Sequence, residues 1–155
     1  MSQRISPADL VEIAVKLEEA GSSFYAQVAE ISSETRSLFE DLSKVEMKHA
    51  QMYRELNPSG DFPGGDGAFE YLSYLVDTGP LRNLRETGKL GETPLNMDEA
   101  FPMAVEFEKE TILFYTGFGS LLSPEAAAIN EKIVVQEKQH LQRVVEAQRR
   151  FQTVR

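Results

Sequence analysis

The sequence predicts an all-α protein, a four-helix bundle in which a long crossover joins two helical hairpins. Four long segments place apolar residues at alternating steps of three and four, the spacing of an amphipathic helix. Strand signals are weak along the whole chain. The segment 58–96 is rich in Gly and Pro and is long for a loop inside a compact domain, so we interpret it as the crossover.

The first hairpin is predicted at residues 6–57. Ser6 followed by Pro7 is typical of a helix start, and an apolar stripe continues from there to about residue 31. The second helix is predicted from about residue 34 to residue 56, where a run of Asn, Pro, Ser and Gly ends it.

The crossover is predicted to hold one short helix, from Ala68 to Val76. A Pro-Gly-Gly loop at 63–65 precedes it, and residues 78–96 are expected to be irregular because glycines and prolines interrupt them. The apolar side chains of the short helix fit either a cap packed over the bundle or a contact in a dimer. They are Phe69, Tyr71, Leu72, Tyr74 and Leu75.

The second hairpin is predicted at residues 97–153. Its first helix begins near Met97 and runs to about Gly119, and Pro102 is tolerated because it falls in the first turns. The last helix begins at Ser123, again with proline next, and runs to about Phe151. We therefore expect residues 1–155 to form a single domain.

The composition excludes several functional classes. The chain has 155 residues, no cysteine, two histidines and a net charge of −9. The missing cysteines exclude disulfides, CxxC zinc sites, thiol catalysis and iron–sulfur ligation. The negative charge argues against a nucleic-acid partner. No apolar run is long enough for a transmembrane helix or a signal peptide, so we expect a cytoplasmic protein without a membrane partner.

An internal repeat carries the candidate chemistry. In the first and third long helices a Glu precedes a Phe-Tyr pair, and the Glu lies seven positions before the Tyr. The second and fourth long helices each carry Glu-x-x-His, and these two motifs contain both histidines of the chain. The residues are Glu18 with Tyr25, Glu46 with His49, Glu108 with Tyr115, and Glu137 with His140.

These spacings predict a metal centre. Residues three apart on a helix can reach one point, and each motif falls on the apolar stripe of its helix. Buried carboxylates are costly unless they are paired or bind a cation. Four oxygen and two nitrogen ligands suit iron or manganese better than zinc. The predicted metal ligands are Glu18, Glu46, His49, Glu108, Glu137 and His140.

Two tyrosines lie beside these ligands in the pattern. Tyr25 and Tyr115 are either core aromatics with a satisfied hydroxyl or residues that hold a ligand carboxylate. We predict no catalytic residue separate from the metal ligands and no further cofactor site.

On these motifs the chain resembles the rubrerythrin-like branch of the ferritin-like superfamily. The resemblance covers both hairpins and leaves the crossover unmatched. It implies a ferritin-like four-helix bundle that holds two iron ions, with manganese or another divalent metal as alternatives, and that reacts with hydrogen peroxide or oxygen. Full rubrerythrins also carry a four-cysteine rubredoxin-like module. This chain has no cysteine, so the resemblance implies a separate electron donor protein.

Three functional hypotheses follow from the sequence. The first is a di-iron oxidoreductase in which ferrous iron reduces peroxide or oxygen. The second is ferroxidase-type iron handling, storage or buffering, without reductive turnover. The third is a metal-free interaction module that keeps these residues. We expect a homodimer, although no assembly motif is evident.

Overall fold

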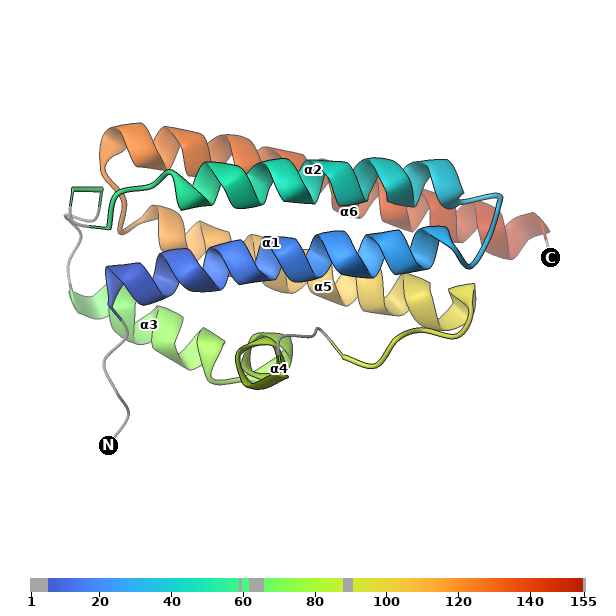
Figure 1. Ribbon diagram of the computed structural model, residues 1–155, viewed down its shortest axis with the longest axis horizontal. Helices are drawn as coiled ribbons and strands as arrows, with labels where there is room; N and C mark the ends of the chain where they lie inside the picture. The colour runs from blue at the N-terminus through green and yellow to red at the C-terminus, as the bar shows by residue number, and fades with distance from the viewer. Residues whose placement is uncertain (1–5, 59, 62–65, 88–90, 155) are drawn as a thin grey trace.

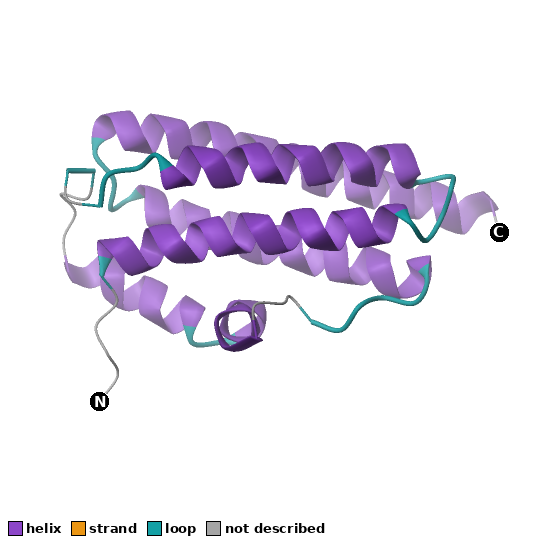
Figure 2. Cartoon of the chain, viewed as in Figure 1, coloured by secondary structure: helices purple, strands orange, loops and turns teal. Residues whose placement is uncertain are grey.

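The computed structural model describes residues 6–58, 60–61, 66–87 and 91–154 (Figure 1). All regular secondary structure within these ranges is helical (Figure 2), which confirms the all-α prediction. The elements are α1 (Pro7–Ala29), α2 (Arg36–Arg54), α3 (Asp66–Val76), α4 (Gly79–Thr87), α5 (Met97–Gly119) and α6 (Pro124–Val154).

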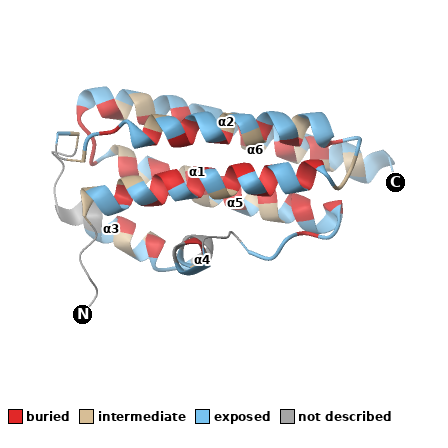
Figure 3. Cartoon of the chain, in the orientation of Figure 1, coloured by how far each residue is buried: buried red, intermediate tan, exposed pale blue. Residues whose placement is uncertain are grey.

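The four long helices form the bundle. Helix α1 packs along α2, and α5 packs along α6, so each hairpin predicted from the sequence is a pair of neighbours in space (Figure 1). The two hairpins meet through contacts of α1 with α5 and of α2 with α6. Buried residues recur along the long helices (Figure 3), and the predicted metal ligands are all among the buried residues.

Side-chain caps begin three of the four long helices, and the sequence indicated those at Ser6 and Ser123. Ser6 and Asp9 form a capping box at α1, in which each side chain accepts a hydrogen bond from the other residue's backbone N–H. At α5, Asn96 Oδ1 accepts from the backbone N–H of Glu99 at 3.0 Å. Ser123 Oγ does the same for Ala126 at α6. These caps satisfy N–H groups that have no partner inside a helix.

Two serines form hydrogen bonds between α1 and α2, where the two helices pack together. Ser22 Oγ donates to the Ser43 backbone carbonyl at 2.9 Å, and Ser43 Oγ donates to the Ser22 carbonyl at 2.8 Å. Reciprocal bonds of this kind need small residues on both helices, because a larger side chain would separate the two backbones. The apolar periodicity did not indicate this pair.

The crossover contains two helices where the sequence predicted one. Helix α3 agrees with the predicted short helix and begins two residues earlier. Helix α4 corrects the expectation that residues 78–96 are irregular. The Gly-Pro pair at 79–80 starts this helix, since a proline in the first turn loses no intrahelical hydrogen bond. Leu84, 2% exposed, anchors α4 in the core. The loop predicted at 63–65 lies outside the described residues.

Helix α3 covers part of α5. Leu72 and Val76 are fully buried, and Leu72 and Tyr71 lie against Gly117 of α5. Tyr71 and Tyr74 remain exposed at 47% and 64%. The inner side of α3 therefore acts as a cap, and a dimer contact through its outer side stays a prediction. The side chain of Phe69 lies outside the described residues. No helix in the described part of the chain is long and apolar enough to cross a membrane.

Gly21 is required where α1 meets α5. A Cβ atom at this position would lie 2.5 Å from Cζ of Phe107, a buried ring. Gly21→Ala should therefore lower the melting temperature, because overpacking costs about 1–3 kcal/mol and exceeds the gain of about 1 kcal/mol in helix propensity.

A double-mutant cycle measured by thermal unfolding tests this contact. The cost of Gly21→Ala should shrink in a Phe107→Leu background, where the shorter side chain leaves room for a methyl group. An equal cost in both backgrounds would contradict the proposed clash.

Candidate metal centre

The bundle brings all six predicted ligands together at its centre. Helices α1 and α5 each contribute one Glu, and α2 and α6 each contribute one Glu and one His one turn apart. These six side chains are between 0% and 4% exposed. The residues are Glu18, Glu46, His49, Glu108, Glu137 and His140.

The ligand atoms form two overlapping groups of four. Within each group the nitrogen and oxygen atoms lie within 4.8 Å of one another, a separation that one ion can bridge. Glu46 and Glu137 belong to both groups, and each group adds one further Glu and one His. The first group is Glu18, Glu46, His49 and Glu137, and the second is Glu46, Glu108, Glu137 and His140.

Both histidines direct Nδ1 at the carboxylates. His49 Nδ1 lies 2.9 Å from Glu137 Oε1 and 3.6 Å from Glu18 Oε1. His140 Nδ1 lies 3.3 Å from both Glu46 Oε1 and Glu137 Oε2. The two rings stack with their centroids 5.9 Å apart. Each imidazole therefore offers the same nitrogen to its group, as the repeated motif requires.

The two tyrosines donate hydrogen bonds to two of the candidate ligand carboxylates, as the second of their two predicted roles requires. Tyr115 Oη donates to Glu18 Oε1 at 2.8 Å, and Tyr25 Oη donates to Glu108 Oε1. Each tyrosine thus donates to the Glu of the other repeat and not to the Glu of its own helix. Burial raises the pKa of both tyrosines, so each hydroxyl keeps its proton and acts as a donor.

A further polar chain extends from Tyr115 toward the end of the bundle. Tyr53 Oη donates to Asn130 Oδ1 at 2.8 Å, and Asn130 Nδ2 donates to the backbone carbonyl of Tyr115 at 2.9 Å. The rings of Tyr53 and Tyr115 lie 4.8 Å apart. Sequence reasoning missed Asn130, although its polar side chain falls on an apolar stripe of α6, which is the signal that could have identified it.

The acid–base properties of the cluster follow from burial and mutual charge. Burial and the charge of Glu137 raise the pKa of both Glu46 and Glu108. Burial alone would also raise the pKa of Glu137, but hydrogen bonds from His140 and His49 outweigh it and lower that pKa.

Burial shifts the pKa of the imidazoles downward, whereas it shifts the pKa of the carboxyl groups upward. Burial lowers the pKa of His49, but hydrogen bonds with Glu137 and Glu46 outweigh it and raise that pKa to about 10. The same balance raises the pKa of His140 to about 9. When no metal binds, the protonated imidazoles of His49 and His140 therefore carry the positive charge of the cluster.

The donor set fits a pair of divalent cations. The second oxygen of each of the four carboxylates is buried and has no hydrogen-bond partner among the described residues. Two of these oxygens still lie near an imidazole nitrogen, Glu137 Oε2 at 3.3 Å from His140 Nδ1 and Glu46 Oε2 at 3.8 Å from His49 Nδ1. Buried polar atoms in native proteins are nearly always satisfied, so the second oxygens of Glu18 and Glu108 indicate a partner other than the described residues. Four carboxylates also carry the charge that balances two divalent ions.

One turn after Glu108 stands Thr111, which is fully buried. Its hydroxyl oxygen has no hydrogen-bond partner within the described part of the chain. A neutral hydroxyl at this position cannot supply the charge of a further carboxylate ligand.

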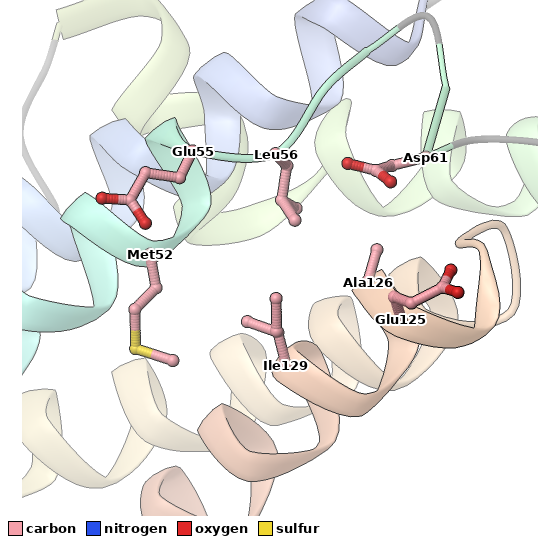
Figure 4. Close-up of a pocket in the computed structure, with 7 residues that line it drawn as sticks. All are labelled: Met52, Glu55, Leu56, Asp61, Glu125, Ala126 and Ile129. Atoms are coloured by element: carbon pink, nitrogen blue, oxygen red, sulfur yellow. The ribbon is translucent and has the colours of Figure 1, made fainter.

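A pocket of about 260 Å³ lies apart from this cluster, between the end of α2, the following loop and the start of α6 (Figure 4). None of the six candidate ligands lines it. Its floor is apolar, and three carboxylates lie around it. The lining residues are Met52, Glu55, Leu56, Asp61, Glu125, Ala126 and Ile129.

Comparison with known proteins bears on the fold. No protein-family model and no curated protein matches the chain. Among solved structures, a Thermotoga maritima protein with the provisional description of a ferritin-like diiron-carboxylate protein is similar, with a TM-score of 0.68 and 24% sequence identity. The match covers 96% of this chain and 98% of that chain. It confirms the predicted ferritin-like fold.

The pKa shifts predict how the metal-free protein responds to pH. The folded state keeps protons on His49 and His140 that the unfolded chain releases near pH 6.5. Their contribution to stability is complete below pH 6.5 and is lost as the pH rises through about 9 and 10. The raised pKa values of Glu46 and Glu108 act in the same direction.

The melting temperature of the metal-free protein should therefore be several degrees lower at pH 9 than at pH 6.5. The control is the same protein saturated with a divalent metal, in which the ion replaces these protons and the decrease should be much smaller. Equal pH profiles for the two forms would contradict the proposed protonation of the cluster.

Proposed function

We propose that this chain is a di-iron carboxylate protein of the rubrerythrin-like branch, an oxidoreductase that reacts ferrous iron with hydrogen peroxide or oxygen. The observation that carries the proposal is the pair of overlapping ligand groups, which share Glu46 and Glu137. Shared carboxylates suit two adjacent ions rather than one. The description of the similar Thermotoga maritima protein as diiron-carboxylate supports the same metal.

The protein residues have defined roles in this proposal. Glu18 and Glu108 would each serve one ion, Glu46 and Glu137 would be available to both, and each His would supply one nitrogen. Bound ferrous iron supplies the electrons for reduction of peroxide or oxygen.

Two further features support the reaction. The tyrosines orient the carboxylates of Glu18 and Glu108. The buried position of the cluster excludes bulk water from the centre, which strengthens the interaction of its charges with a cation. These 155 residues contain no cysteine. We propose that a separate donor protein would supply the electrons that restore ferrous iron.

One substitution separates a metal centre from a metal-free structural module. Glu108→Gln keeps the shape of the side chain and removes a charge that burial disfavours. The metal-free variant should melt at the same or a higher temperature than the wild type, whereas the stabilisation by added ferrous iron should fall sharply.

Glu106→Gln, an exposed position on the same helix, is the matched control for this experiment and should leave the stabilisation by ferrous iron unchanged. If Glu108→Gln destabilised the metal-free protein and left the metal response intact, the cluster would be structural.

The reaction itself is tested by anaerobic loading with two equivalents of ferrous iron per chain, followed by hydrogen peroxide or oxygen. A ferric absorbance should appear at a rate proportional to oxidant, and it should be at least roughly 10-fold weaker in Glu108→Gln, in line with the loss of a metal ligand.

After this first oxidation, a reductant and then more oxidant are added to the same sample. This step distinguishes repeated turnover from iron handling. Renewed cycles in the presence of reductant support the oxidoreductase. A single cycle followed by retained ferric iron supports ferroxidase-type handling, and absence of any ferric absorbance contradicts both.

A further inference from the structure

The two imidazoles of the repeated motif differ at the nitrogen that faces away from the carboxylates. His49 Nε2 lies 2.5 Å from the side-chain oxygen Oε1 of Gln136. His140 Nε2 has no hydrogen-bond partner among the described residues. The two groups of candidate ligands are therefore similar in the residues they contain but differ in the hydrogen bonding of their imidazole Nε2 atoms.

This asymmetry originates in the sequence. Gln136 directly precedes Glu137 on α6, and its side chain reaches across to His49 on α2. The equivalent position of the other repeat directly precedes Glu46 on α2, and it is occupied by Val45. Valine has no polar side-chain atom, so the first repeat cannot supply the same bond to His140.

A hydrogen bond at Nε2 affects how the other nitrogen binds a cation. An imidazole that binds a metal through Nδ1 must carry its proton on Nε2. An oxygen acceptor at Nε2 favours that tautomer and fixes the rotation of the ring, and it also increases the basicity of Nδ1. His49 has this support and His140 lacks it.

We propose that Gln136 is a positioning residue that makes the two metal positions unequal, so that the group containing His49 binds a divalent cation first. The group containing Glu108 and His140 then fills at a higher metal concentration. This inference rests on the proposed metal centre, and it adds an order of binding that the repeated ligand motif alone does not contain.

The proton on Nε2 provides a direct test. The chain has only two histidines, so protein labelled with ¹⁵N-histidine and loaded with Zn²⁺ gives two imidazole signals. In the wild type, one Nε2–H should be protected from exchange with water and the other should exchange rapidly. Gln136→Leu should abolish the protection, and Gln136→Glu, which keeps an oxygen acceptor, should retain it.

Calorimetric titration with Zn²⁺ tests the order of binding. The wild type should bind in two steps. Gln136→Leu should weaken the first step by roughly 10- to 100-fold, the usual effect of removing a partner of a metal-bound imidazole, and leave the second step nearly unchanged. Gln142→Leu, an exposed glutamine on the same helix, is the matched control and should change neither step.

The outcomes distinguish this inference from the proposed function. Equal protection of both Nε2–H groups in the wild type, or an unchanged first step in Gln136→Leu, would overturn the role of Gln136 while leaving the metal centre intact. Absence of binding of both Zn²⁺ and Fe²⁺ by the wild-type protein would contradict the metal centre itself.

Discussion

The burial of four carboxylates and two imidazoles at the centre of an apolar bundle is the constraint on which the structure depends. An isolated charge in such a place is strongly disfavoured, so every one of these groups needs a partner. Two tyrosine hydroxyls, two imidazoles and shared protons meet part of that need. Four carboxylate oxygens have no hydrogen-bond partner among the described residues, and they mark where cations would bind.

The same constraint explains how the two hairpins fit together. The first ligand group takes three residues from the first hairpin and Glu137 from the second, and the other group takes three from the second hairpin and Glu46 from the first. The hydrogen bonds of Tyr25 and Tyr115 also join one hairpin to the other. The relative position of the hairpins is therefore set by polar contacts at the centre as well as by apolar packing around it.

The sequence predicted the features that depend on one helix at a time. Glu-x-x-His on an apolar stripe indicated which carboxylates are buried, and caps such as Ser6 located the helix starts. It did not predict the bond of Gln136 to His49 or the paired serines 22 and 43, because these need the register between two helices. Helix α4 was missed for a local reason, since Gly-Pro ends one helix and begins the next.

The repeat within the chain also has a consequence for assembly. One hairpin supplies a Glu, a Glu-x-x-His and a Tyr, and the other supplies the same set, so two copies of a single hairpin would contain every ligand type of the complete cluster. The crossover turns that bimolecular encounter into an intramolecular one with a high effective concentration. Formation of the cluster is then independent of how dilute the protein is.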